Sequence, residues 1–252
     1  LPKKASLFVV LIIIAILVAF SLGGILKGAT GAGAPIITIP VIAAFYDVRI
    51  AVIIMVIPNL LTNIGQLYQF RKTILPKFFT LSFAIGGGIG AFLGTILLAN
   101  LSIKILTLSV AFIVIVYILL KLIVPSWKLT YEKAKKLVFL MGGFGGVLQG
   151  TAGLSAPISI TFLNSMKLER NQFIPTISVY FGVMSIFQMP TLYYYNFLNL
   201  EIVLVSCIST LVLLSFMPIG SWIAKSVSKE SFDKITLILL GFIAFRIIYL
   251  NF

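Results

Sequence analysis

Two short glycine-rich stretches interrupt the apolar sequence where a membrane-spanning helix would otherwise continue. Residues 24–36 read GILKGATGAGAPI and residues 146–158 read GVLQGTAGLSAPI, and the two align without a gap at an offset of 122 residues. Each stretch combines glycines, which weaken a helix, with a proline of the kind tolerated in the first helical turn. We therefore interpret the chain as a duplication in which each half contains a broken helix, with a new helix starting at each Ala-Pro step.

The composition places these breaks inside a membrane protein. Hydrophobic residues make up 60% of the 252 positions, charged residues make up 10%, and the mean hydropathy is +1.17. Such a composition cannot supply both a core and a water-soluble surface. The first apolar run, 5–26, is too long for a signal-peptide core, so we expect it to stay in the mature protein. The sequence predicts a multi-pass protein of the cell (plasma or inner) membrane, in contact with the lipid bilayer.

Apolar runs occur five times in each half of the chain. They cover residues 5–26, 35–46, 50–70, 75–99 and 103–124, and then 134–148, 157–166, 173–195, 202–224 and 232–250. The second run of each half is too short for a helix to cross a hydrocarbon core of about 30 Å. We predict an all-α polytopic membrane protein with two tandem repeats, residues 1–125 and 126–252. Each repeat has about four transmembrane helices plus one short half or re-entrant helix.

The basic residues are spread over the loops, so the net charge of +13 does not indicate a nucleic-acid partner. Four crossings per half make the two halves parallel and put both termini in the cytoplasm. In that arrangement the basic residues expected on the cytoplasmic side, which the positive-inside rule favours, are Lys3, Lys4, Arg71, Lys72, Lys77 and those of the 121–136 connector. The basic residues expected outside are Arg49, Lys104, Lys167, Arg170, Lys225, Lys229 and Lys234.

The two Ala-Pro steps predict a buried anion site. If Pro35 and Pro157 begin helices, Ala34 and Ala156 are the cap residues, and alanine has no side-chain oxygen to accept from first-turn amides. The amides near Ile36, Ile37, Ile158 and Ser159 would then be free to bind an oxyanion, helped by the positive end of each helix dipole. Water or backbone carbonyls are the alternative partners of these amides.

Other polar or small residues in and beside the breaks join this predicted substrate site. The glycines Gly31, Gly33 and Gly153 allow a close approach of the backbone, and Thr30, Thr151 and Ser155 contribute hydroxyl groups. Lys27 and Gln149 occupy matched positions just before the breaks. For Lys27, an alternative is that its ammonium group snorkels to a membrane interface.

A second polar signal lies on the third apolar run of each half. Asn59, Asn63 and Gln66 share one helical face, and Ser185 and Gln188 stand 122 residues after the last two. Because the pair recurs in both halves, we predict that Asn63, Gln66, Ser185 and Gln188 line the cavity. Hydrogen bonding between helices is the alternative role.

Missing residue types exclude several classes of function. The chain has no histidine and a single cysteine, Cys207, so we predict no metal site, no cofactor and no enzymatic activity. Its six acidic residues lie in or beside loops, so the membrane part lacks the carboxylate relays of ion pumps. A carrier of anions needs no such countercharge.

The glycine motifs resemble those of the TauE/SafE family of sulfite and organosulfonate exporters. GAGAPIITIP at 31–40 resembles the family's first motif, GLSAP at 153–157 resembles its second-half variant, and Gly220 with SKE at 228–230 resembles the approach to its final helix. Ala34, Pro35 and Ser155 replace glycines of the usual pattern, and Phe162 stands where a second proline can occur. The resemblance covers essentially the whole chain and implies a transporter of small sulfur oxyanions.

Taken with the residues, the resemblance predicts an exporter of sulfite or a small organosulfonate that works by alternating access. The first alternative is a transporter of another small anion, either a carboxylate or an inorganic oxyanion. A non-transporting membrane subunit is a weaker alternative because the loops are short, and a membrane-embedded enzyme is weaker still. The sequence does not determine the oligomeric state.

Overall fold

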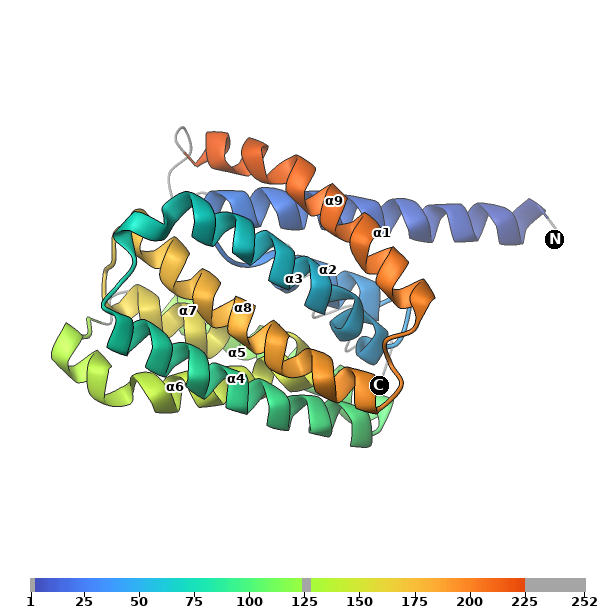
Figure 1. Ribbon diagram of the computed structural model, residues 1–252. Coiled ribbons are helices and arrows are strands. Elements are labelled where there is room, and N and C mark those ends of the chain that lie inside the picture. Colours follow the sequence, from blue (N-terminus) through green and yellow to red (C-terminus); the bar gives the residue numbers. More distant parts are fainter. Residues whose placement is uncertain (1–2, 124–127, 225–252) are drawn as a thin grey trace.

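The computed structural model describes residues 3–123 and 128–224, and all regular secondary structure in this part of the chain is helical (Figure 1). The apolar run 232–250 and the C-terminus lie outside the described residues. The elements, in chain order, are α1 (Lys3–Thr30), α2 (Ala34–Ala43), α3 (Val48–Phe70), the 3-10 turn η1 (Arg71–Thr73), α4 (Lys77–Asn100), α5 (Ile103–Ile123), α6 (Tyr131–Ala152), α7 (Ala156–Ser165), α8 (Arg170–Tyr194) and α9 (Leu200–Ile223).

Helix lengths confirm the predicted fold class. Within the described residues, six helices are long and apolar enough to cross a membrane, namely α1, α3, α4, α5, α8 and α9. The short runs form α2 and α7, each of 10 residues, which is about 15 Å of helix and half a bilayer. The protein is therefore an all-α polytopic membrane protein. The division into repeats at residue 125 stays a prediction.

Each short helix folds back along the long helix that precedes it. A Cβ on Gly23 of α1 would lie 3.5 Å from Ala34 Cα and 2.9 Å from Thr38 Cγ2, both in α2. In the second half, a Cβ on Gly145 of α6 would lie 3.5 Å from Ser159 Cβ in α7. The broken helices therefore form two hairpins, α1–α2 and α6–α7. The turn of each hairpin lies within the bundle.

The two hairpins enter the bundle from opposite faces of the membrane. Helix α6 runs parallel to α4, because Gly90 and Gly94 of α4 pack against Gly143 and Val147 of α6. Helix α1 runs parallel to α9, since Gly24 and Gly28 pack against α9 residues in the same order along both helices. Helices α4 and α8 share a direction, and α9 returns from the end of α8 (Figure 1). The predicted parallel arrangement of the halves is therefore wrong, because α1 and α6 run in opposite directions.

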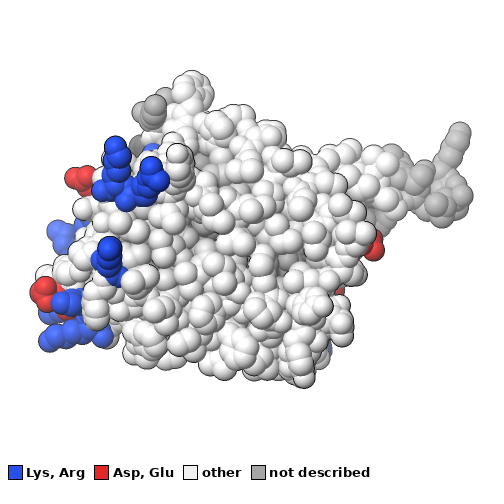
Figure 2. All heavy atoms as spheres, in the orientation of Figure 1, with Lys and Arg blue, Asp and Glu red and all other residues white. Residues whose placement is uncertain are grey.

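Basic side chains gather at one end of the bundle, which we call the basic face (Figure 2). Loops at this end are joined by hydrogen bonds from Thr73 Oγ1 to Asn171 O and from Leu129 N to Ser165 O. The opposite face carries Asp47, Arg49, Lys104 and Glu201, at the starts of α3, α5 and α9. The basic residues in η1, at the starts of α4, α6 and α8 and just after α7 make up this basic face, and they are Arg71, Lys72, Lys77, Lys128, Lys133, Lys135, Lys136, Lys167 and Arg170.

This arrangement overturns the predicted grouping of loops. Helix α1 begins at the face opposite to the start of α6, so the start of α1 and residues 128–136 of the connector do not share a side (Figure 1). Lys167 and Arg170 lie with Arg71 and not across the membrane from it. The physical reason is that each short helix, with its turns, returns the chain toward the face from which the preceding long helix came. A count of the long helices alone does not include this return.

Glycines hold the parallel pairs together by backbone contact. A Cβ on Gly146 would lie 2.2 Å from Gly87 O and 2.9 Å from Ala91 N, and a Cβ on Gly24 would lie 2.7 Å from Leu213 O. Ala91 and Leu213 are themselves 122 positions apart, as Gly24 and Gly146 are. The α4·α6 and α1·α9 contacts thus use matched positions, and each joins the N-terminal to the C-terminal part of the chain.

We expect Gly146→Ala to destabilise the protein by about 1–3 kcal/mol, because the added methyl group overlaps the backbone of α4. Gly65→Ala is the matched control, since nothing lies within 4 Å of a Cβ at that helical position. Thermal unfolding of the purified protein in detergent measures both effects. Equal stability of the two variants would contradict the close packing of α4 on α6.

Candidate functional site

Both helix breaks contain backbone conformations that favour glycine. The φ angles are +82° at Gly31, +105° at Gly33 and +70° at Gly153. At the end of α1 the amide of Gly31 donates to Lys27 O at 2.7 Å, and at the end of α6 the amide of Gly153 donates to Gln149 O at 2.8 Å. The two long helices therefore end in the same way, with a left-handed glycine after the last turn.

The short helices begin one residue earlier than predicted, at Ala34 and Ala156. Their N-caps are Gly33 and Ser155, and neither forms a side-chain cap hydrogen bond, which confirms that side-chain caps are absent from the two breaks. However, the predicted free amides of three residues are not free. Backbone carbonyls of the cap residues accept from Ile36, Ile158 and Ser159 at 2.9–3.0 Å.

The first amides of the two short helices have a different environment. The amides of Ala34 and Ala156 have no backbone acceptor among the described residues. Both residues are buried, with exposed fractions of 1% and 4%. Two hydrogen-bond donors at the positive ends of α2 and α7 are thus left inside the bundle.

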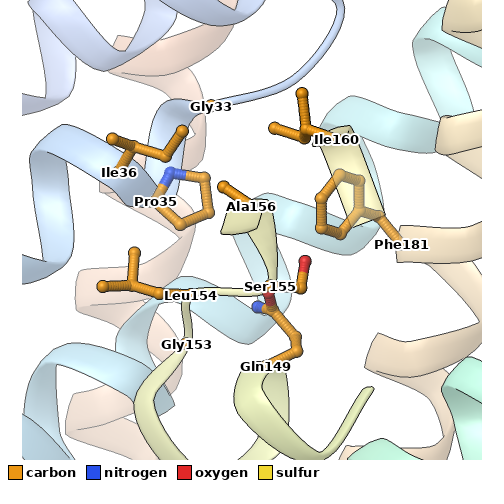
Figure 3. Close-up of a pocket in the computed structure, with 10 residues that line it drawn as sticks. All are labelled: Gly33, Pro35, Ile36, Gln149, Gly153, Leu154, Ser155, Ala156, Ile160 and Phe181. Atoms are coloured by element: carbon orange, nitrogen blue, oxygen red, sulfur yellow. The ribbon is translucent and has the colours of Figure 1, made fainter. Parts of the chain in front are cut away.

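A buried pocket brings the two breaks together (Figure 3). Its cavity volume is about 10 Å³, which is room for about one water molecule. The first break contributes Gly33, Pro35 and Ile36, and Ile160 and Phe181 complete the wall. The second break and the end of α6 contribute Gln149, Gly153, Leu154, Ser155 and Ala156. Residues far apart in the sequence therefore form one site at the turns of both hairpins.

The pocket offers a few polar groups in an apolar wall. Gln149 has an exposed fraction of 4%, and its Oε1 has no hydrogen-bond partner among the described residues. Ser155 Oγ accepts from Ser159 Oγ at 2.9 Å. The rest of the wall is aliphatic or aromatic, so a polar ligand here exchanges water for a small number of directed hydrogen bonds.

Lys27 is buried beside this pocket. Its exposed fraction is 1%, its Nζ donates to Asn63 Oδ1 at 2.9 Å, and Nζ lies 5.8 Å from the ring centroid of Phe181. The ammonium group therefore does not snorkel to an interface. Phe181 links Lys27 to the pocket, because the same ring forms part of the pocket wall.

The predicted polar residues of α3 and α8 form a network next to Lys27. Asn63 Nδ2 donates to Asn59 O at 2.6 Å and to Asn59 Oδ1 at 3.0 Å, and Asn59 Nδ2 donates to Ser185 Oγ at 3.4 Å. Gln66 Nε2 donates to Lys27 O at 3.3 Å. This network joins α1, α3 and α8. These residues therefore form hydrogen bonds between helices, which is the alternative role considered for them in the sequence.

Two glutamines of the predicted polar faces have unsatisfied atoms. Gln66 Oε1 and both amide atoms of Gln188 lack partners among the described residues, and the two side chains are 4% and 1% exposed. Neither residue lines the pocket, and neither do Asn63 and Ser185. The polar faces therefore contact Lys27, which lies beside the pocket, but they do not form the pocket wall.

Several other predicted residues shape the breaks without lining the pocket. Thr30 Oγ1 donates to Leu26 O at 2.8 Å and also contacts Ala32 O, and Thr151 Oγ1 donates to Gly94 O of α4 at 3.2 Å. A Cβ on Gly31 would lie 2.4 Å from Ile174 Cγ1 of α8. The remaining predicted residues outside the wall are Ala34, Pro157 and Ile158.

Leu154, Ile160 and Phe181 line the pocket but are absent from the predicted site. A signal for Phe181 exists in the sequence, because it stands 122 positions after Asn59 and one helical turn before Ser185. Leu154 and Ile160 are ordinary apolar residues among many, and only the fold distinguishes them.

Arg170 is a further residue that sequence reasoning did not place near the breaks. Its Nη2 donates to Gly28 O at 2.9 Å, its Nε donates to Ala29 O at 3.3 Å, and its guanidinium group lies 5.6 Å from the Phe70 ring centroid. Gly28 O also accepts from Ser221 Oγ at 3.0 Å. Arg170 at the start of α8 thus satisfies carbonyls at the end of α1.

Membrane-length helices around a buried pocket, with two broken helices meeting at its wall, define a class of multi-pass membrane proteins that includes many secondary transporters. The chain belongs to the sulfite exporter TauE/SafE family, whose sequence model matches residues 14–247, nearly the whole chain. This finding confirms the resemblance seen in the glycine motifs, and the family is one of membrane transporters. No curated protein and no solved structure matches the chain significantly.

We expect Asn63→Leu to destabilise the protein by about 2–4 kcal/mol, because it leaves the buried Lys27 ammonium without its acceptor. The double variant Lys27→Met/Asn63→Leu removes both partners and should recover most of the loss. Unfolding midpoints in detergent for the wild type, both single variants and the double variant complete the cycle. Additive effects of the two substitutions would show that this hydrogen bond is not energetically coupled.

Proposed function

We propose that the protein is a transporter of a small sulfur oxyanion, sulfite or a small organosulfonate, and that it binds this anion between the two helix breaks. The observation that carries the proposal is the pocket to which both breaks contribute. It lies at the starts of α2 and α7, contains Gln149, whose Oε1 has no partner among the described residues, and adjoins the buried Lys27 through Phe181. Family membership supports the substrate class.

The groups at the pocket favour an anion over a cation. The amide of Ala156 in the wall is a donor, the amide of Ala34 is a second donor at the start of α2 between the lining residues Gly33 and Pro35, and Lys27 supplies a positive charge next to the wall. None of the described acidic residues lines the pocket. The oxygen atoms of a sulfite or sulfonate group accept from several donors at once, and the apolar wall of Ile36 and Ile160 suits a short organic substituent.

In this proposal the remaining predicted residues support the site. Lys27 and Asn63 provide the charge and its orientation, and Gln66, Ser185 and Gln188 border it. The shape of the breaks depends on Thr30, Gly31, Thr151, Gly153 and Pro157.

Transport would occur by alternating access, through a rocking motion around the bound anion. The opposite directions of α1 and α6 suit this mechanism, because related halves of opposite direction form a similar gate at each membrane face. Both halves also contribute to the pocket wall. We further propose that the physiological direction is export.

We propose that the protein resides in the cell membrane with the basic face in the cytoplasm, as the positive-inside rule requires. The N-terminus is then outside, which reverses the orientation predicted from the sequence. The reversal follows from the start of α1 at the face opposite to the starts of α4 and α6 (Figure 1).

Single cysteines at Lys133 and Lys104, introduced after Cys207→Ser, test this orientation in intact cells. A membrane-impermeant thiol reagent should label Lys104→Cys and not Lys133→Cys, because the two positions are on opposite faces. Permeabilisation should make both positions reactive. Labelling of Lys133→Cys alone in intact cells would invert the proposed orientation.

Flux of sulfite in proteoliposomes tests the function itself. The purified protein should accelerate sulfite movement over protein-free liposomes, and excess methanesulfonate should compete. Gln149→Leu should lower the flux at least about ten-fold, since it replaces a polar group of the pocket by an apolar one. Gln69→Leu is the matched control because Gln69 is exposed. Absence of flux with every anion tried, or equal flux in both variants, would refute the proposed site or function.

A further inference from the structure

The charge of the pocket region is unequal between the two breaks. Lys27 and Gln149 stand at matched positions, each four residues before the glycine that ends its helix. Gly31 N bonds to Lys27 O and Gly153 N bonds to Gln149 O, so the two side chains leave equivalent turns of α1 and α6. One position therefore carries an ammonium group and the other carries a neutral amide.

Lys27 is the only charged side chain among the buried polar residues of the described chain. Arg170 also contacts the end of α1, but its side chain is exposed. Its guanidinium group already donates to Gly28 O and Ala29 O and lies over the Phe70 ring. The described acids, Asp47, Glu132, Glu169 and Glu201, lie outside the pocket, at helix starts near the membrane faces. The buried side chains thus contribute a single positive charge.

Helix dipoles do not add a second net charge. The positive starts of α2 and α7 lie at the breaks, but the negative ends of α1 and α6 lie at the same breaks. Each end is worth about half an elementary charge of opposite sign, so the sum is close to zero. The dipoles orient a ligand at the pocket and leave its charge to be balanced by Lys27.

We propose that the site accepts singly charged oxyanions and rejects doubly charged ones, because Lys27 alone balances the ligand and Gln149 keeps the matched position neutral. This inference rests on the proposed function and names the charge class of its substrate. A monoanion, which for sulfite is the protonated form hydrogensulfite, completes a neutral pair with Lys27 in the membrane interior. A dianion of the same size leaves one uncompensated negative charge there, which is costly in a low-dielectric medium.

Methanesulfonate and sulfate are suitable probes because both are tetrahedral, similar in size and built on one sulfur atom, while their charges differ by one. In proteoliposomes containing the wild-type protein, we expect methanesulfonate to move about 100-fold faster than sulfate at equal concentration. This ratio corresponds to the insertion cost of one charge at the centre of a membrane helix. A ratio within about two-fold of one would overturn the inference.

Variants at the matched positions locate the effect. Gln149→Lys adds a second charge and should raise the sulfate to methanesulfonate ratio at least about ten-fold. The exchange variant Lys27→Gln/Gln149→Lys restores a single charge and should regain the wild-type preference. Lys104→Gln is the control for total charge, because Lys104 is exposed at a membrane face, and its ratio should equal that of the wild type.

The outcomes separate this inference from the proposed function. Flux of sulfite and methanesulfonate with no preference over sulfate would leave the transporter intact and refute the charge limit. A wild-type preference that Gln149→Lys leaves unchanged, in protein with a normal unfolding midpoint, would also refute it. Absence of flux with all three anions would refute the proposed function.

Discussion

The constraint on which this structure depends is that backbone groups freed at a helix break inside a membrane must find partners within the protein. The chain breaks two helices deep in the bundle and satisfies most of the freed groups locally. Gly31 and Gly153 close the ends of α1 and α6, and the cap carbonyls of Gly33 and Ser155 accept from the next turns. Among the described residues, the amides of Ala34 and Ala156 are left without a backbone acceptor at the starts of α2 and α7, and Ala156 lines the pocket that both breaks share.

Close backbone contact keeps the two breaks opposite each other. The breaks belong to α1 and α6, and each of these helices packs through glycines on a helix from the other part of the chain, α9 and α4. Gly153 also packs against Val52 of α3, as Gly31 packs against Ile174 of α8, and Val52 and Ile174 are again 122 positions apart. Neither break is therefore held by its own half alone, and the pocket between them depends on contacts that cross the chain.

The sequence was sufficient to predict the membrane class, the two breaks and the short helices, because glycine, proline and apolar length act locally. Direction was predicted wrongly, since it depends on how the turns around α2 and α7 carry the chain, and a count of long runs does not contain that information. Lys27 and Gln149 were found from their matched positions. Phe181 was missed because an aromatic residue in an apolar helix looks like packing until its neighbours in space are known, and Arg170 was missed because its partners are backbone carbonyls.

The contact between Asn59 and Ser185 has a mechanical consequence. It joins two antiparallel helices near the middle of each, α3 over Val48–Phe70 and α8 over Arg170–Tyr194. When two rods turn against each other about a point at mid-length, their ends travel far while the pivot hardly moves. In the proposed rocking motion this hydrogen bond would serve as a fulcrum, so that a small rotation opens one membrane face while the residues around Lys27 keep their partners.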